Sequence, residues 1–200
     1  MKRILSMIAS ASFLIAMTSC ATKDVYTKGK YVNPERVDLL SDKFVESDLQ
    51  MIADTLSDSL IADPVVDSLG RKPAIIQSLF TNATDEHIDI LSLTNMIRQN
   101  LMKSHKFRFL NNRLRGELAE EYEYAASGYV DSQTAKLKGR QIGADWLISG
   151  HITSIKQPVG KTEIVYYKTT LEVTDLETSE ILWADEVEIK KQFTRKKVRP

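Results

Sequence analysis

Two stretches near the C-terminal end decide the fold: TEIVYYKTTLEV (residues 162–173) and SEILWADEVEIKK (residues 179–191). Apolar side chains fall at every second position in both, which is typical of a β-strand with one buried and one polar face. They are Val165, Tyr167, Leu171 and Val173, then Ile181, Trp183, Val187 and Ile189. The preceding stretch ADWLISGHITSI (residues 144–155) has similar character. Together the three stretches predict an antiparallel meander.

Asp185 falls on the apolar side of this alternation. A carboxylate there is costly unless it has a partner or stays near water. We therefore expect a bulge, a position at the rim of the sheet, or a hydrogen bond to another element.

Upstream, the apolar spacing alternates between helix and strand. GRKPAIIQSLFTNAT (residues 70–84) predicts a continuous strand that is apolar, and covered, on both faces. A helix precedes it, with Ser41 as the expected N-cap. A second helix follows it. Their apolar stripes are Val45, Leu49, Ile52, Leu56 and Leu60, then Ile90, Leu93, Ile97 and Leu101.

The middle of the chain predicts a short strand and two further helices. KFRFL (residues 106–110) reads as the strand, and Asn111 and Asn112 mark the turn that leaves it. The third helix ends at Gly128, and a shorter one is expected over about residues 132–142. The apolar stripe of the third helix comprises Leu114, Leu118, Tyr122 and Ala125, and the spacing of Gly139 and Gly143 suits close packing. The order predicts an α/β fold: a single-domain sandwich of one mixed sheet with antiparallel C-terminal strands and helices packed on it.

The N-terminal stretch MKRILSMIASASFLIAMTSC (residues 1–20) combines two basic residues, a short apolar run and small residues, typical of a secretory signal. MTSC, residues 17–20, resembles a bacterial lipobox. We expect residues 1–19 to be a signal peptide and Cys20 to be lipidated and held at the outer membrane, on its periplasmic face. The alternatives are an ordinary signal peptide that contains a cysteine, or a short N-terminal helix.

The domain boundaries follow from the same segments. Residues 20–36 read as the lipidated N-terminus and a tether, residues 37–192 as the globular domain, and residues 193–200 as a basic tail. Removal of residues 1–19 leaves 25 Lys+Arg against 27 Asp+Glu (27 − 2 = 25), a net charge of about −2. This balance gives no sign of a nucleic-acid partner. Cys20 is the only cysteine, so we expect neither a disulfide nor a cysteine metal site.

The sequence predicts no enzyme, cofactor or metal site. His87, His105 and His151 stand far apart, without the His-Glu-x-x-His pattern of a zinc enzyme. There is also no nucleophile elbow, phosphate-binding glycine loop or dinucleotide fingerprint.

Basic residues form two groups along the chain. One lies at the C-terminal end: Lys190, Lys191, Arg195, Lys196, Lys197 and Arg199. The other comprises Lys103, Lys106, Arg108, Arg113 and Arg115. The groups are either ordinary solvated side chains or a positive patch for an acidic protein or anionic lipid.

Four stretches, taken in order, resemble the LpoB family of outer-membrane lipoproteins that activate penicillin-binding proteins. They are SDKFVESDLQMIADTLSDSL (41–60), TNATDEHIDILSLTNMIRQNLMKSHKFRFL (81–110), IGADWLISGHITSI (142–155) and TTLEVTDLETSEILWADEVEIKK (169–191). The resemblance implies a domain related to the N-terminal domain of TolB. It also implies a protein without catalysis that docks on and stimulates a bifunctional (class A) penicillin-binding protein in peptidoglycan synthesis.

The chain departs from that family in three places. His105 and Ser179 stand where the family favours glycine, so both are expected at positive φ. The tether has only about 20 residues, which reach at most about 65–70 Å extended and about 25 Å as a coil. Enteric members use a longer tether, so their docking geometry does not carry over directly.

Two other functions stay open at this level. A secretion or assembly lipoprotein of the curli-channel (CsgG) type has a similar Gly-Ala and Ile-Ser-Gly segment and a similar C-terminal hairpin. Such a channel needs additional long strands for its pore, for which this chain has no insertion. A general envelope scaffold is the remaining alternative.

Overall fold

The computed structural model describes residue 33, residues 41–136 and residues 138–194. The chain divides into two compact units, Met1–Pro34 and Glu35–Pro200, and the fold described here is that of the second. Its helices are α2 (Glu46–Ala62), α3 (Ile90–Lys103) and α4 (Arg115–Ala126), with short 3-10 turns η2 (Pro64–Asp67) and η3 (Asn112–Leu114). Its strands are β1 (Ala74–Gln77), β2 (Thr81–Ala83), β3 (Arg108–Phe109), β4 (Trp146–Val159), β5 (Thr162–Asp175) and β6 (Ile181–Thr194).

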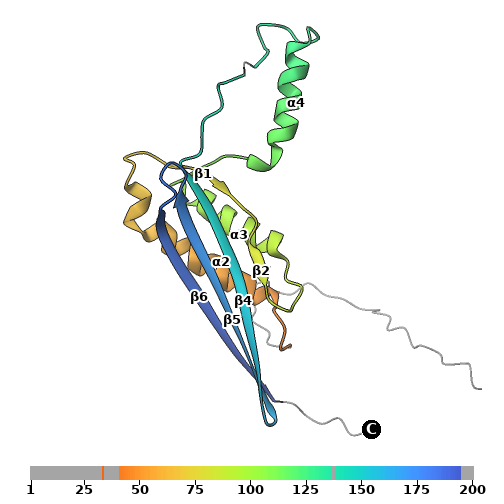
Figure 1. Ribbon diagram of the computed structural model, residues 1–200, viewed down its shortest axis with the longest axis vertical. Coiled ribbons are helices and arrows are strands. Elements are labelled where there is room, and N and C mark those ends of the chain that lie inside the picture. Colours follow the sequence, from red (N-terminus) through yellow and green to blue (C-terminus); the bar gives the residue numbers. More distant parts are fainter. Residues whose placement is uncertain (1–32, 34–40, 137, 195–200) are drawn as a thin grey trace, which may run out of the picture. The chain divides into compact units, whose positions relative to one another are not determined.

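The six strands form one mixed sheet, as the sequence predicts. The order is β3-β1-β4-β5-β6, and β2 pairs with β4 beyond the end of β1. β3, β1 and β2 run parallel to their partners, whereas β4, β5 and β6 form the expected antiparallel meander (Figure 1). α2 packs against α3 and β6. Most of the predicted stripes lie in the core shared with the sheet, Leu49 and Ile90 are partly buried against it, and Val45 precedes α2 and is not in the core. The α/β sandwich is confirmed.

The predicted strand over residues 70–84 is two strands. The chain leaves the sheet between Gln77 and Thr81, where Leu79 points outward (56% exposed) and Phe80 turns inward. Gly150 on β4 makes room for this ring. A Cβ there would lie 2.6 Å from the carbonyl oxygen of Thr170 and 2.7 Å from the Phe80 ring. The prediction of one continuous strand is therefore wrong, and only β1 is largely buried on both faces, whereas β2 is mostly exposed.

The start of α2 also differs from the prediction. The helix begins at Glu46, and the Asp48 carboxylate accepts a hydrogen bond of 2.8 Å from the Val45 N–H. Ser41 lies outside the helix, where its hydroxyl accepts from the Lys43 N–H. The N-cap is thus Val45, and Asp48 satisfies its backbone from within the first turn.

α4 forms where the sequence predicts a helix, but none of its residues is buried. Leu114 and Leu118 of its apolar stripe are 46% and 41% exposed, and Leu118 lines two hollows together with Val130 and Ile142 of the segment that follows. The described residues of that segment, 130–136 and 138–142, form turns and irregular chain, so the predicted helix over 132–142 is wrong. Gly139 has φ +81° and open space around it, so it supplies a turn rather than close packing.

The meander follows the predicted alternation with one shift. Val165, Tyr167, Leu171 and Val173 are buried, as are Trp183, Val187 and Ile189. Ile181 is 59% exposed, because an irregularity opposite Val173 and Thr174 inserts Leu182 into the register. Asp185 accepts a hydrogen bond from the Ser59 hydroxyl of α2, one of the three outcomes expected for it.

Both predicted positive-φ positions are confirmed. His105, just after α3, has φ 56°, and Ser179 in the β5–β6 turn has φ 64°. The Ser179 N–H closes this turn on the Asp175 carbonyl at 2.9 Å.

Candidate interaction surface

The two lysines at the start of the predicted C-terminal basic group lie in different environments. Lys190 is exposed on the sheet face opposite the helices. Lys191 is buried: its ammonium group pairs with Asp48, donates to the Lys43 carbonyl (3.0 Å) and lies 5.6 Å from the centre of the Tyr167 ring. β6 continues to Thr194, so strand alternation turns Lys191 inward. Its assignment to a surface patch is therefore wrong.

The other residues of the predicted patch, Arg195, Lys196, Lys197 and Arg199, lie outside the described residues, as does Cys20. Their roles stay predictions.

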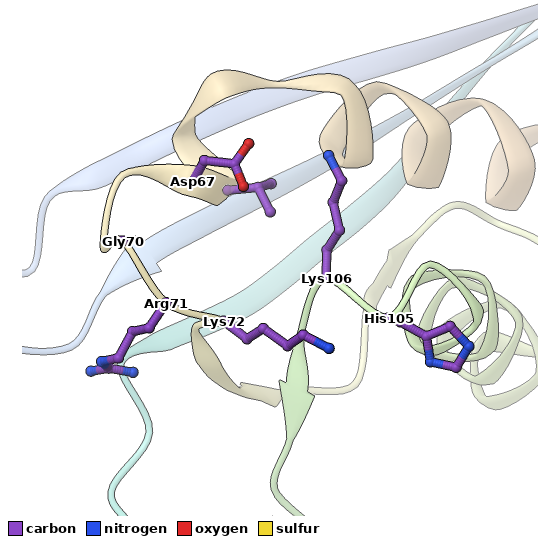
Figure 2. A pocket seen from close by; sticks show the side chains of 7 residues that line it. Asp67, Gly70, Arg71, Lys72, His105 and Lys106 are labelled. Carbon is purple, nitrogen blue, oxygen red and sulfur yellow. The ribbon is translucent and has the colours of Figure 1, made fainter.

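Part of the second basic group lies around an open hollow of about 360 Å³ (Figure 2). Lys106 meets Arg71 and Lys72 there, and Asp67 and His105 complete the polar lining. Arg71 and Lys72 precede β1, whereas His105 and Lys106 precede β3. Parallel pairing of β1 and β3 places their N-terminal ends side by side, which explains why residues more than thirty positions apart meet.

Two of these cations are already engaged by the protein. The Lys106 ammonium group donates to the Ile61 carbonyl at the end of α2 (2.8 Å), and in Figure 2 it points toward that helix. The Arg71 guanidinium makes two hydrogen bonds of 2.7 Å to the Asp145 carboxylate. The hydrogen bond from Arg71, followed by that from the Ala74 N–H, lowers the pKa of Asp145 despite its partial burial. Lys106 and Arg71 at the hollow therefore make contacts that hold the fold together.

The basic surface continues along the edge of the sheet. Arg108 is exposed on β3, Arg113 lies in η3, and Arg115 opens α4. Lys103 ends α3 and is also exposed. Arg98 on α3 joins this surface and was missed by sequence reasoning. The sequence signal for Arg98 was that it lies four residues before Met102, which places both side chains on one side of α3.

A polar cluster between the sheet and the start of the domain includes Glu86. Its carboxylate pairs with Lys156 (2.7 Å) and accepts from the Tyr167 hydroxyl (2.8 Å) and the Phe44 N–H (2.8 Å). Burial alone would raise the pKa of Glu86, but these hydrogen bonds together lower it. Burial and the bond to Glu86 raise the pKa of Tyr167. The cluster fixes the chain just before α2 to the sheet.

The three histidines are spread over the molecule. His87 is exposed before α3, His105 lies in the hollow, and His151 is exposed on β4. Within the described residues, no group of three or more His, Cys, Asp or Glu side chains is placed to hold a metal ion. No helix in that part of the chain is both long and apolar enough to cross a membrane.

A family model described as "Peptidoglycan-synthase activator LpoB" matches residues 48–189, from the first turn of α2 to Ile189 in β6. The chain belongs to the LpoB family. The family is one of regulatory proteins that activate a peptidoglycan synthase. No curated protein matches the chain in sequence.

Solved structures of LpoB proteins are similar to this chain, at low identity. The LpoB C-terminal domain from Escherichia coli shares 14% identity with a TM-score of 0.44, and that from Salmonella enterica shares 14% with a TM-score of 0.43. Each match covers 72% of this chain and 99% of the other. The lipoprotein GNA1162 from Neisseria meningitidis is also similar, at 9% identity and a TM-score of 0.40, over 60% of this chain and 83% of that one.

Proposed function

We propose that this protein is an envelope lipoprotein that binds and activates a bifunctional, class A penicillin-binding protein. The observation that carries the proposal is the LpoB family match, which spans nearly the whole folded domain. The lipid on Cys20 would hold the protein at the periplasmic face of the outer membrane, and residues 20–36 would be the lipidated N-terminus and tether. The protein would act by contact alone.

The basic surface supports an electrostatic contribution to binding. Arg108, Arg113 and Arg115 are exposed along one edge of the domain, with Lys103 close in sequence at the end of α3. Exposed charges mainly affect the rate of association, and their effect decays over about 8–10 Å at physiological salt. Binding should therefore weaken as salt is added.

The proposal is tested by reconstitution. Residues 21–200 are added to each class A synthase of the same host, and glycan polymerisation and cross-linking are measured with and without them. Direct binding is measured in parallel at low and high salt. The proposal predicts saturable binding and faster synthesis with at least one synthase. Absence of both with every class A synthase of the host would refute it.

A further inference from the structure

The edge strand β3 has backbone N–H and C=O groups that pair with no other strand among the described residues. β3 is the terminal strand in the sheet order. The Arg108 N–H bonds to the Pro73 carbonyl and the Leu110 N–H to the Ile75 carbonyl, both at 2.9 Å. Successive peptide groups of a strand point to opposite sides, so the N–H and C=O of Phe109 point away from β1. Among the described residues, no strand pairs with this side.

Two hollows meet at this edge, and both are lined by Phe109, Leu110 and Asn111. One, of about 430 Å³, is completed by α3 through Arg98, Gln99 and Met102. The other, of about 310 Å³, is completed by α4 and the segment before β4, through Arg115, Leu118, Tyr122, Gln141 and Ile142. Met102, Ile142 and Leu118 are 51%, 47% and 41% exposed. Apolar surface is thus available on either side of an open strand edge.

The charge of both hollows has one sign. Among the described residues that line them, Arg98 and Arg115 are the only charged ones, and no carboxylate accompanies them. Arg108 and Arg113 are exposed beside them. An occupant with carboxylate groups would gain charge-assisted hydrogen bonds there, whereas a basic one would be repelled.

A buried polar group lies one strand inward. Gln77 ends β1, and its carbonyl accepts a hydrogen bond of 3.4 Å from the Asn112 side-chain amide beyond β3. Gln77 is 5% exposed, and neither polar atom of its side-chain amide has a hydrogen-bond partner in the described part of the protein. Such a group is costly to bury. The open edge therefore lies one strand away from a buried amide that has no partner in the described part of the protein.

We propose that the β3 edge binds an extended segment of a protein partner, with acidic and apolar side chains in alternation. The segment adds a strand by pairing with the Phe109 backbone, its apolar side chains enter the hollows, and its carboxylates pair with Arg98 and Arg115. This is strand addition, in which backbone hydrogen bonds supply affinity and alternate side chains supply specificity. The inference does not depend on the identity of the partner as a synthase.

The test uses a short, capped peptide of alternating valine and glutamate, titrated into ¹⁵N-labelled residues 21–200 and followed by NMR. Two matched peptides serve as controls: one with lysine in place of glutamate, and one with proline at the central position. Saturable binding of the first peptide is expected, with the largest shifts over residues 107–115. The lysine peptide should not bind, and the proline peptide should bind at least about tenfold more weakly.

Variants of the protein separate edge binding from general charge attraction. Arg98→Glu and Arg115→Glu should each weaken binding of the glutamate peptide by about tenfold or more, whereas Lys190→Glu on distant β6 should not. Phe109→Pro removes the outward N–H and keeps the two N–H groups that bond to β1. Its thermal melt reports whether it folds, and the two arginine variants keep the test decisive if it does not.

Two outcomes would overturn the proposal. One is no saturable binding of the glutamate peptide up to about 1 mM. The other is binding that shifts another surface, or that ignores the arginine reversals. If the edge variants lose the peptide but still stimulate a synthase, the edge serves another partner and the proposed function stands.

Discussion

The ammonium group of Lys191 lies in the core beside the Asp48 carboxylate, with side chains only 3% and 4% exposed. Asp48 also accepts from the Val45 N–H, and Lys191 also donates to the Lys43 carbonyl. Two charges removed from water are tolerated because each has further hydrogen bonds. The pair therefore joins the start of α2 to the last strand.

Removal of one partner should be costly. Asp48→Ala leaves Lys191 charged and buried, so we expect a loss of about 3–5 kcal/mol in the free energy of unfolding, measured by urea denaturation. Asp48→Ala combined with Lys191→Met should lose clearly less, because no unpaired charge remains. The exposed neighbour variant Lys190→Met should change stability by no more than about 0.5 kcal/mol. A double variant as unstable as Asp48→Ala alone would show that the N-terminal turn of α2, rather than the charge, matters.

Residue-scale prediction succeeded where the resemblance to the LpoB family pointed to a glycine position. His105 and Ser179 lie in turns whose backbone demands positive φ, and both were located from the glycine expected there. Lys191 was misassigned because its environment depends on where β6 ends and on Asp48, 143 positions away in sequence. No local pattern encodes such a partner.

At the scale of elements, α3 and α4 have similar apolar spacing but opposite burial. α3 buries Leu93, Ile97 and Leu101 against the sheet, whereas α4 buries nothing. Periodicity predicts that a helix has an apolar side and does not state what covers it. The same limit explains the wrong helix over 132–142 and the split of the strand over 70–84, which turns on the contact of Phe80 with Gly150.

Matched substitutions on the two helices should give different costs. Leu93→Ala removes a fully buried side chain and should cost about 2–5 kcal/mol of unfolding free energy. Leu118→Ala removes one that is 41% exposed and should cost less than about 1 kcal/mol. Urea melts of both variants provide the measurement. Equal losses would mean that α4 is covered in solution.

The stability that Asp145 contributes, at the start of β1 and β4, should depend on pH. Asp145 has a lowered pKa because it is hydrogen-bonded by Arg71 and by the Ala74 N–H. A lowered carboxyl pKa in the folded state stabilises the protein above the ordinary value of 3.8, and this contribution is lost as pH falls through the lower folded pKa. Asp145→Asn should therefore be less stable at neutral pH, and its difference from the wild type should shrink in acid.

The measurement is urea unfolding at a series of pH values, with Asp58→Asn on the exposed side of α2 as the control. A constant difference between wild type and Asp145→Asn across the series would contradict the assignment.

At the scale of the whole molecule, the sequence predicted fold and family but not the shape of the candidate surface. The α/β class, the mixed sheet and the antiparallel meander follow from periodicity. The basic hollow brings Arg71 and Lys72 to Lys106 only through the parallel pairing of β1 and β3. Sequence reasoning listed basic residues by their closeness along the chain, and so left Arg71, Lys72 and Arg98 out of the surface.

The predicted attachment to the membrane depends on one thiol. Cys20→Ser should release the protein from the membrane fraction, or leave it with an uncleaved signal, because no other residue is predicted to carry lipid. Fractionation after a high-salt wash, with mass spectrometry of the N-terminal peptide, gives the readout. Lys23 follows the predicted lipidation site and carries no thiol, so Lys23→Ser is the matched control and should stay in the membrane.

A processed Cys20→Ser protein that remains in the washed membranes would refute the anchor. It would then be necessary to look for a protein contact that holds the domain there.

The bond between Lys191 and the Lys43 carbonyl has a consequence for where a lipid or a linker can be attached to the domain. Residues 43 and 191 touch, so the chain enters and leaves the folded unit at one corner. A lipid attached through a linker after Thr194 would then orient the domain relative to the membrane in almost the same way as a lipid attached before Ser41. For the same reason the domain should tolerate circular permutation. A short linker would join the two ends without crossing the core, and the new termini would lie within residues 130–136, where no side chain is buried.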